Sequence, residues 1–193
     1  MFDHLKPLKP RVAVSAVSSP LEVGADRAPQ AARDLAALLE QAGCEVLLLE
    51  PIGTADQATA SGQQLAAAQV DALALAPVSW FEDYLVLDLL EECPLPLLLW
   101  PLPGMETGAL CGTQQLTCFL QQLGRPYRGL FGPLEPGSML DQALVFLRAA
   151  ALHRRLRRAR VGLAGHRVGG MTYTAPHELA LKRALGPRVV PLD

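Results

Sequence analysis

Apolar residues follow two alternating patterns along this chain. Short runs rich in apolar residues predict strands, and each is followed by apolar residues three or four positions apart, which predict helices. The run at Leu95–Trp100 leaves no polar face, which predicts a strand buried on both sides. The predicted strands cover residues 11–17, 45–49, 71–76, 95–100 and 127–131. Strands that alternate with helices favour a doubly wound parallel sheet of the flavodoxin-like or Rossmann-like kind, with right-handed crossovers.

The last part of the chain repeats the strand and helix pattern once more. Residues 160–164 and 188–192 are predicted strands, and residues 176–185 between them form a predicted helix. Two strands and one helix cannot bury their own faces. This segment therefore either extends the first sheet or opens a second domain.

Composition narrows the class of protein. A hydrophobic content of 50% is ample for a buried core, and the net charge of -2 gives no reason to expect nucleic acid as a partner. The arginine-rich run at 153–160 ends a long predicted helix, where cations suit the helix dipole. The chain shows no signal-peptide core and no apolar run long enough for a membrane span. We expect a cytoplasmic protein that binds neither nucleic acid nor membrane.

The cysteines and histidines do not form a recognisable metal or catalytic motif. Cys44, Cys93, Cys111 and Cys118 lack metal-ligand spacing and are interpreted as reduced thiols. Among the scattered histidines, only His166 follows a predicted strand directly. The chain also lacks the glycine-rich phosphate motifs of dinucleotide and nucleoside-triphosphate sites, and a flavin-binding domain is the weakest of the functions considered. We expect no catalytic and no metal-binding residue within this chain.

A ligand site is best sought at the strand ends, because open α/β sheets bind ligands outside the carboxyl ends of their strands. After the third strand, Ser79 and Glu82 have the spacing of a helix capping box, which places Trp80 in the first helical turn. Its indole either joins the core or faces a ligand, and spacing does not decide between the two. After the fourth strand, Gln114 offers an amide from a loop.

Four segments resemble the amino-terminal part of the L-fucose and L-arabinose isomerase-like proteins. They are SPLEVGADRAP at 19–29, APVSWFEDYLVLDLLEE at 76–92, PLLLWPLPGMETGALCGTQQL at 96–116 and RRARVGLAGHRVGGM at 157–171. The resemblance implies a doubly wound amino-terminal domain and a second α/β domain that begins near Arg160. It leads us to expect a first domain at residues 1–153 and the opening βαβ unit of an incomplete second domain at 154–193.

The resemblance also implies a function. Those enzymes interconvert aldoses and ketoses at a manganese ion whose ligands lie in later domains, so the metal centre is expected outside this chain. An aromatic residue and an arginine of the family's first domain face the active site of an adjacent subunit, and Trp80 and Arg27 occupy the matching positions. An indole can lie against a sugar ring while a guanidinium donates to its hydroxyls.

Two interpretations of the whole chain remain open at this stage. In the first, the chain is the substrate-gating, oligomer-forming portion of such an isomerase. Its expected partners are a monosaccharide and either further copies of the chain or the carboxy-terminal remainder of the enzyme. In the second, it is a stand-alone, non-catalytic sugar-binding or regulatory module.

Overall fold

The computed structural model describes residues 8–104, 108–165, 169–171 and 175–192. The chain divides into two compact units, unit 1 at Met1–Ala150 and unit 2 at Ala151–Asp193. The division falls within one helix, α5 (Ser138–Arg158), three residues before the boundary expected from the sequence.

Unit 1 is built on a five-stranded, all-parallel sheet with the strand order β2-β1-β3-β4-β5. The strands are β1 (Arg11–Val17), β2 (Glu45–Leu48), β3 (Ala72–Pro77), β4 (Leu97–Leu99) and β5 (Tyr127–Gly129). The chain reverses its direction of travel across the sheet between β1 and β3, as in flavodoxin-like folds. The predicted doubly wound α/β fold is thereby confirmed.

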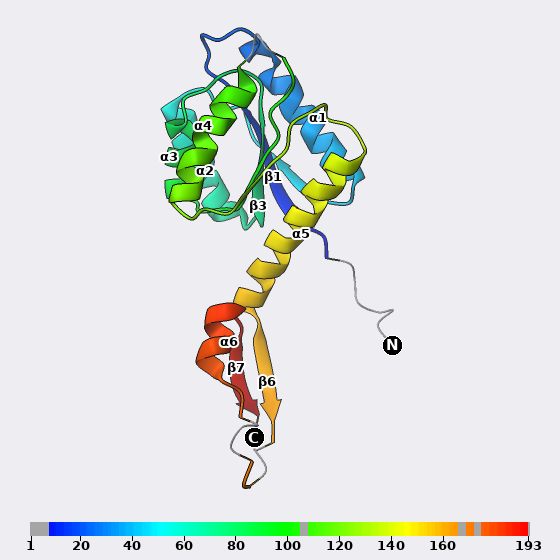
Figure 1. Ribbon diagram of the computed structural model, residues 1–193, viewed down its shortest axis with the longest axis vertical. Helices are drawn as coiled ribbons and strands as arrows, with labels where there is room; N and C mark the ends of the chain where they lie inside the picture. The colour runs from blue at the N-terminus through cyan, green and yellow to red at the C-terminus, as the bar shows by residue number, and fades with distance from the viewer. Residues whose placement is uncertain (1–7, 105–107, 166–168, 172–174, 193) are drawn as a thin grey trace. The chain divides into compact units, whose positions relative to one another are not determined.

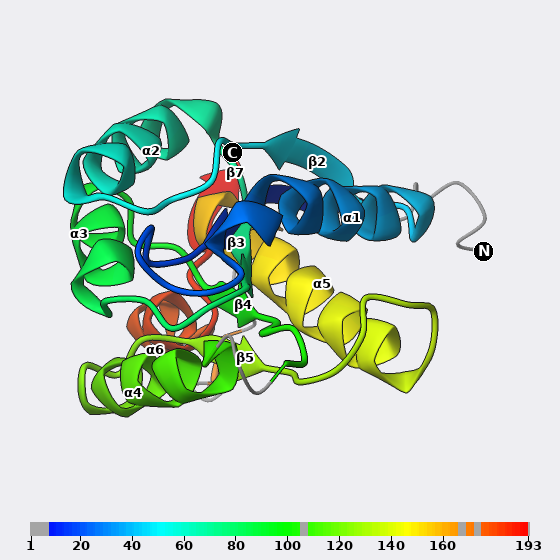
Figure 2. The same cartoon turned by 90° about the horizontal axis from the view of Figure 1, so that it is seen from above.

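Helices cover both faces of this sheet (Figures 1 and 2). On one face lie α1 (Ala28–Gln41) and the first turns of α5; on the other lie α2 (Ala55–Ala68), α3 (Tyr84–Glu92) and α4 (Ala109–Gln122). Strand pleating sends alternate residues into separate cores. In β3, Ala74 and Ala76 pack toward α1, whereas Leu73 and Leu75 pack toward α2 and α3.

A capping box begins α2, whereas the capping box predicted for α3 is wrong. At α2, the Gln57 amide N–H donates to Thr54 Oγ1 over 3.4 Å, and the Gly53 N–H donates to the Gln57 side chain over 2.9 Å. By contrast, α3 begins at Tyr84, so Trp80 lies in the preceding loop and not in a helical turn. The Ser79 hydroxyl instead donates to the Trp80 carbonyl over 2.7 Å.

Unit 2 contains a two-stranded parallel sheet of β6 (Arg160–Ala164) and β7 (Arg188–Leu192), joined through α6 (Glu178–Ala184). Gly186, just before β7, has φ +93°, and a Cβ there would lie 2.6 Å from Arg157 Cγ, so a side chain fits neither the backbone nor the space. The described helices include no segment with the length and apolarity needed to cross a bilayer.

Candidate functional site

The loops that follow β1 and β3 are tied together at the carboxyl edge of the unit 1 sheet. The Ser19 N–H donates to the Trp80 carbonyl over 3.0 Å and also lies 3.2 Å from Ser79 Oγ. The Ser19 hydroxyl lies 3.4 Å from Glu82 Oε1, which explains why Ser79 and Glu82 do not cap α3. These two loops flank the point where the strand order reverses, the usual ligand position in such sheets.

The loop after β1 directs its backbone N–H groups to its own chain. Phosphate-binding loops present several free N–H groups to their ligand. Here four N–H groups donate to carbonyls at 3.1–3.2 Å: Ser18 to Ile52, Glu22 to Ser19, Ala25 to Glu22, and Arg27 to Gly24. These four N–H groups are therefore not available to a phosphate.

Trp80 is half-buried at this edge, and its backbone is held by two other loops. Besides the bond from Ser19, Gly108 approaches so closely that a Cβ there would lie 3.0 Å from Trp80 Cβ. Trp100 differs, because it is fully buried and its indole N–H donates to the Gly132 carbonyl over 3.1 Å. Trp80 is thus positioned by the fold while part of its side chain remains accessible.

Arg27 and Gln114 lie on different elements of unit 1. Arg27 ends the short 3-10 helix η1 (Ala25–Arg27) after β1, is half-buried, and directly precedes α1. Gln114 is exposed and belongs to α4, which starts at Ala109, earlier than the sequence pattern indicated. The prediction that placed Gln114 in a loop was therefore wrong, because Gly108, with φ +62°, already serves as the N-cap of α4.

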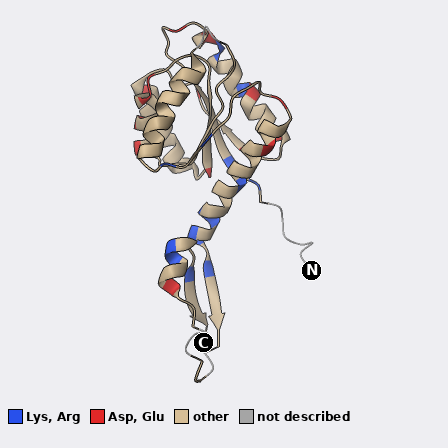
Figure 3. Ribbon diagram, viewed as in Figure 1, with Lys and Arg blue, Asp and Glu red and all other residues tan. Residues whose placement is uncertain are grey.

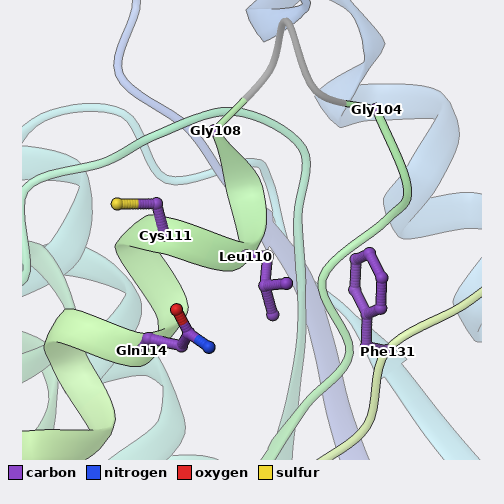
Figure 4. Close-up of a pocket in the computed structure, with 6 residues that line it drawn as sticks. All are labelled: Gly104, Gly108, Leu110, Cys111, Gln114 and Phe131. Carbon is purple, nitrogen blue, oxygen red and sulfur yellow. The ribbon is translucent and has the colours of Figure 1, made fainter.

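A hollow of about 290 Å³ opens beside the first turns of α4 (Figure 4). Leu110, Cys111 and Gln114 line it from α4. Phe131 lines it from the segment after β5, and the remaining described lining residues are Gly104 and Gly108. Gln114 is the predicted site residue that lines this hollow, whereas Trp80 and Arg27 are not among its described lining residues.

The lining suits a small neutral ligand. Phe131 and Leu110 offer apolar surface, and the Gln114 amide can both donate and accept hydrogen bonds. The volume lies near the lower end of the range for ligand sites, about 300–1,000 Å³. None of the described lining residues is charged, so a phosphorylated ligand would find no cation in this part of the wall.

Metal ligands and histidines can be located for the described residues only. Among these, no three His, Cys, Asp or Glu side chains lie close enough to hold a metal ion. His177 is the N-cap of α6, where its Nδ1 accepts from the Ala180 N–H over 3.0 Å. His166, singled out in the sequence, lies outside the described residues.

Three residues of the hollow were missed by sequence reasoning. Leu110 and Cys111 occupy a helical turn that the pattern assigned to a loop, and Phe131 was assigned to the fifth strand as an ordinary strand residue. The available signal was position, because each follows the carboxyl end of a strand. Their convergence depends on how α4 packs beside β5, which no local pattern encodes.

Comparisons with known proteins do not assign a function to this chain. No protein-family model and no curated protein matches the chain. Among solved structures, the chain is similar to an oxidoreductase from Corynebacterium diphtheriae, with a TM-score of 0.36 and 13% identity over 75% of this chain and 94% of that chain. A similarity at this level carries no argument about activity.

Proposed function

We propose that this chain is the amino-terminal, substrate-gating and oligomer-forming portion of an L-fucose/L-arabinose isomerase-like aldose-ketose isomerase. The observation that carries the proposal is the half-buried Trp80, held at the carboxyl edge of the sheet by Ser19 and Gly108. The hollow lined by Gln114 at the same edge and the four sequence segments that resemble the family support it further.

In this proposal the chain binds and orients a monosaccharide. The Trp80 indole contacts the apolar face of the sugar, and the Gln114 amide and Arg27 guanidinium donate to hydroxyls. Because the loops around Trp80 are already bonded to one another, little ordering is needed when the sugar binds. Manganese, bound outside this chain, would stabilise charge on the sugar oxygens during proton transfer between adjacent carbons.

The cytoplasmic setting is part of the same proposal. Cys44, Cys111 and Cys118 are free thiols, and the last two are exposed. Thiols that are not paired in disulfides are typical of reducing compartments.

The first experiment is calorimetric titration of the purified chain with L-fucose and with L-arabinose, without added metal. We expect saturable binding that weakens at least fivefold in Trp80→Ala and in Gln114→Ala. Matched controls are Tyr84→Ala, an exposed aromatic residue of α3, and Gln121→Ala, an exposed glutamine of α4. Absence of binding heat with either sugar, or equal losses in the controls, would contradict the proposed site.

The second experiment separates the isomerase portion from a stand-alone sugar-binding module. The chain is assayed for aldose-ketose interconversion with manganese, first alone and then mixed with a carboxy-terminal remainder of a family enzyme. We expect no turnover alone and measurable turnover in the mixture. Sugar binding without turnover in the mixture would favour the non-catalytic module instead.

A further inference from the structure

A groove of about 440 Å³ lies along β5 and α5, apart from the hollow beside α4. Its described lining residues are Arg128 from β5 and Asp141, Gln142, Val145, Phe146 and Ala149 from α5. All of them belong to unit 1, and none is a described lining residue of the hollow. The volume falls within the range of ligand sites, about 300–1,000 Å³. The groove is therefore a second candidate site, built without any residue of the incomplete second domain.

The lining residues of α5 share one face of the helix. Counted from Asp141, they occupy positions i, i+1, i+4, i+5 and i+8, which lie above one another along the helix. At a rise of about 1.5 Å per residue, this face is about 12 Å long. Asp141 and Gln142 make its first turn polar, whereas Val145, Phe146 and Ala149 make the following turns apolar. The groove therefore has a polar end and an apolar end.

The polar end holds one positive and one negative group. The Arg128 guanidinium donates to the side-chain oxygen of Gln142, which holds it beside the first turns of α5. Acidic charge lies near the start of α5, and the arginines of that helix concentrate in its later turns (Figure 3). Within the described part of the chain, neither Arg128 nor Asp141 forms an ion pair, with each other or with another residue. Both charges are therefore available to a ligand.

The apolar end presents hydrophobic surface to the groove. Val145 is 67% exposed, although it lies on a helix that packs against the sheet. Phe146 is half-buried, because part of its ring packs against the core on the α1 side of the sheet. Ala149 is small and exposed, so it leaves room above the helix. An apolar group that covers these three side chains would remove their surface from water, which favours binding.

The two ends together discriminate between classes of ligand. A ligand with only negative charge is attracted by Arg128 but repelled by Asp141, and a ligand with only positive charge meets the reverse. A neutral sugar pairs neither charge and places hydroxyl groups against apolar side chains. A ligand that carries a carboxylate, an ammonium group and an apolar substituent forms charge-assisted hydrogen bonds at one end and apolar contacts at the other. This combination is that of an apolar α-amino acid.

We propose that the groove between β5 and α5 binds a free α-amino acid with a large apolar side chain. The Arg128 guanidinium donates to the α-carboxylate, the ammonium group donates to the Asp141 carboxylate, and the side chain lies against Val145 and Phe146. No covalent bond forms or breaks, so the site serves binding and not catalysis. The inference goes beyond the proposed sugar site and uses none of its residues, so the two can fail separately.

The first test is calorimetric titration of the full chain with L-leucine and with L-phenylalanine, at two temperatures. We expect saturable binding of at least one of them. The matching acid without the ammonium group, 4-methylpentanoate or 3-phenylpropionate, should bind at least tenfold more weakly. So should the matching amine without the carboxylate, 3-methylbutylamine or 2-phenylethylamine. Absence of binding heat with both amino acids, or equal affinity for an analogue that lacks one charge, would overturn the inference.

The second test neutralises one charge of the groove at a time. Arg128→Gln and Asp141→Asn should each weaken binding of the amino acid at least tenfold. The matched controls are Arg148→Gln, an exposed arginine of α5, and Asp56→Asn, an exposed acid in the first turn of α2. Neither is a described lining residue of the groove, so both control variants should bind the amino acid as the parent protein does.

The analogues show which ligand group each charge contacts. In Arg128→Gln the amino acid should bind no more tightly than the matching amine, because the carboxylate has lost its partner. In Asp141→Asn it should bind no more tightly than the matching acid. Far-UV circular dichroism checks that each variant is folded. Folded variants that keep the full preference for the amino acid over both analogues, or controls that lose binding equally, would contradict this assignment of the groove.

Discussion

The molecule contains two parallel sheets whose strands resemble each other in sequence but not in environment. Every residue of β3 is buried, whereas every residue of β6 is exposed, although both strands are mostly apolar. The difference arises from the covering layers. Two layers of helices enclose the unit 1 sheet, while the described part of unit 2 contains only the seven-residue α6 and the end of α5. An apolar run therefore identifies a strand, but only the fold shows whether its side chains are covered.

The largest expected difference in stability follows from replacing one leucine by alanine in each sheet. Leu73 in β3 is fully buried, so Leu73→Ala should destabilise unit 1 by about 2–5 kcal/mol. Leu163 in β6 is 40% exposed, so Leu163→Ala should cost about 0.5 kcal/mol or less. Urea unfolding followed by far-UV circular dichroism measures both. Equal losses would show that the two sheets are packed alike.

The next largest effect on stability is expected from comparing a glycine of unit 1, Gly62, with a glycine of unit 2, Gly162. In Gly62→Ala the new Cβ meets the Leu89 carbonyl oxygen at 2.8 Å, so two helices must separate, at a cost of about 1–3 kcal/mol. In Gly162→Ala the nearest atom is the end of the exposed Leu192 side chain at 2.8 Å, which can rotate away. We expect the free energy of unfolding of the Gly162 variant, measured in urea, to lie within about 0.5 kcal/mol of that of the parent protein.

The two tryptophans compare the core of unit 1 with the carboxyl edge of its sheet. Trp100→Phe removes a buried indole that donates to the Gly132 carbonyl and should cost about 1–3 kcal/mol. Trp80→Phe, at a half-buried position, should cost about 1 kcal/mol or less. Acrylamide should quench the emission of Trp80 in the Trp100→Phe variant more strongly than that of Trp100 in the Trp80→Phe variant. The reverse order of quenching would show that the Trp80 indole is not accessible, although the proposed sugar site requires it to be.

The smallest expected effect on stability concerns the thiol of Cys44 in unit 1. Burial raises the pKa of the Cys44 thiol, and nearby Arg148 offsets this only in part. Because the unfolded thiol ionises first, stability should be full below its ordinary pKa and fall as pH rises through it toward the higher folded value. Cys44→Ala should reduce this alkaline loss, measured as the urea midpoint between pH 7 and 10. An unchanged pH profile in that variant would exclude Cys44 as its source.

The sequence was sufficient for the fold and insufficient for the detail of the site. The strands of unit 1 were correctly predicted because each lies between helical patterns, although the edge strands β2 and β5 are only partly buried. The spacing of Ser79 and Glu82 resembles that of Thr54 and Gln57, yet only the latter caps a helix, because Ser19 competes from sixty residues away. Such long-range hydrogen bonds are not encoded in local spacing.

Positive and negative residues are unevenly distributed along the sequence, but the net charge of the whole chain does not show this. Acids and cations nearly cancel over 193 residues, so the net charge of -2 gave no sign of an acidic unit 1 and a basic unit 2. The exposure of the unit 2 strands could not be read from their apolar pattern either, since the same pattern in unit 1 belongs to a covered sheet. Charge and exposure became informative only when assigned to separate units.

Hydrogen exchange at individual amides tests the central claim most directly: helices cover both faces of the unit 1 sheet, whereas β6 of unit 2 is exposed. Amides of β3 should be strongly protected, while those of β6 should exchange at least tenfold faster. Amides of β6 that are as protected as those of β3 would contradict the account.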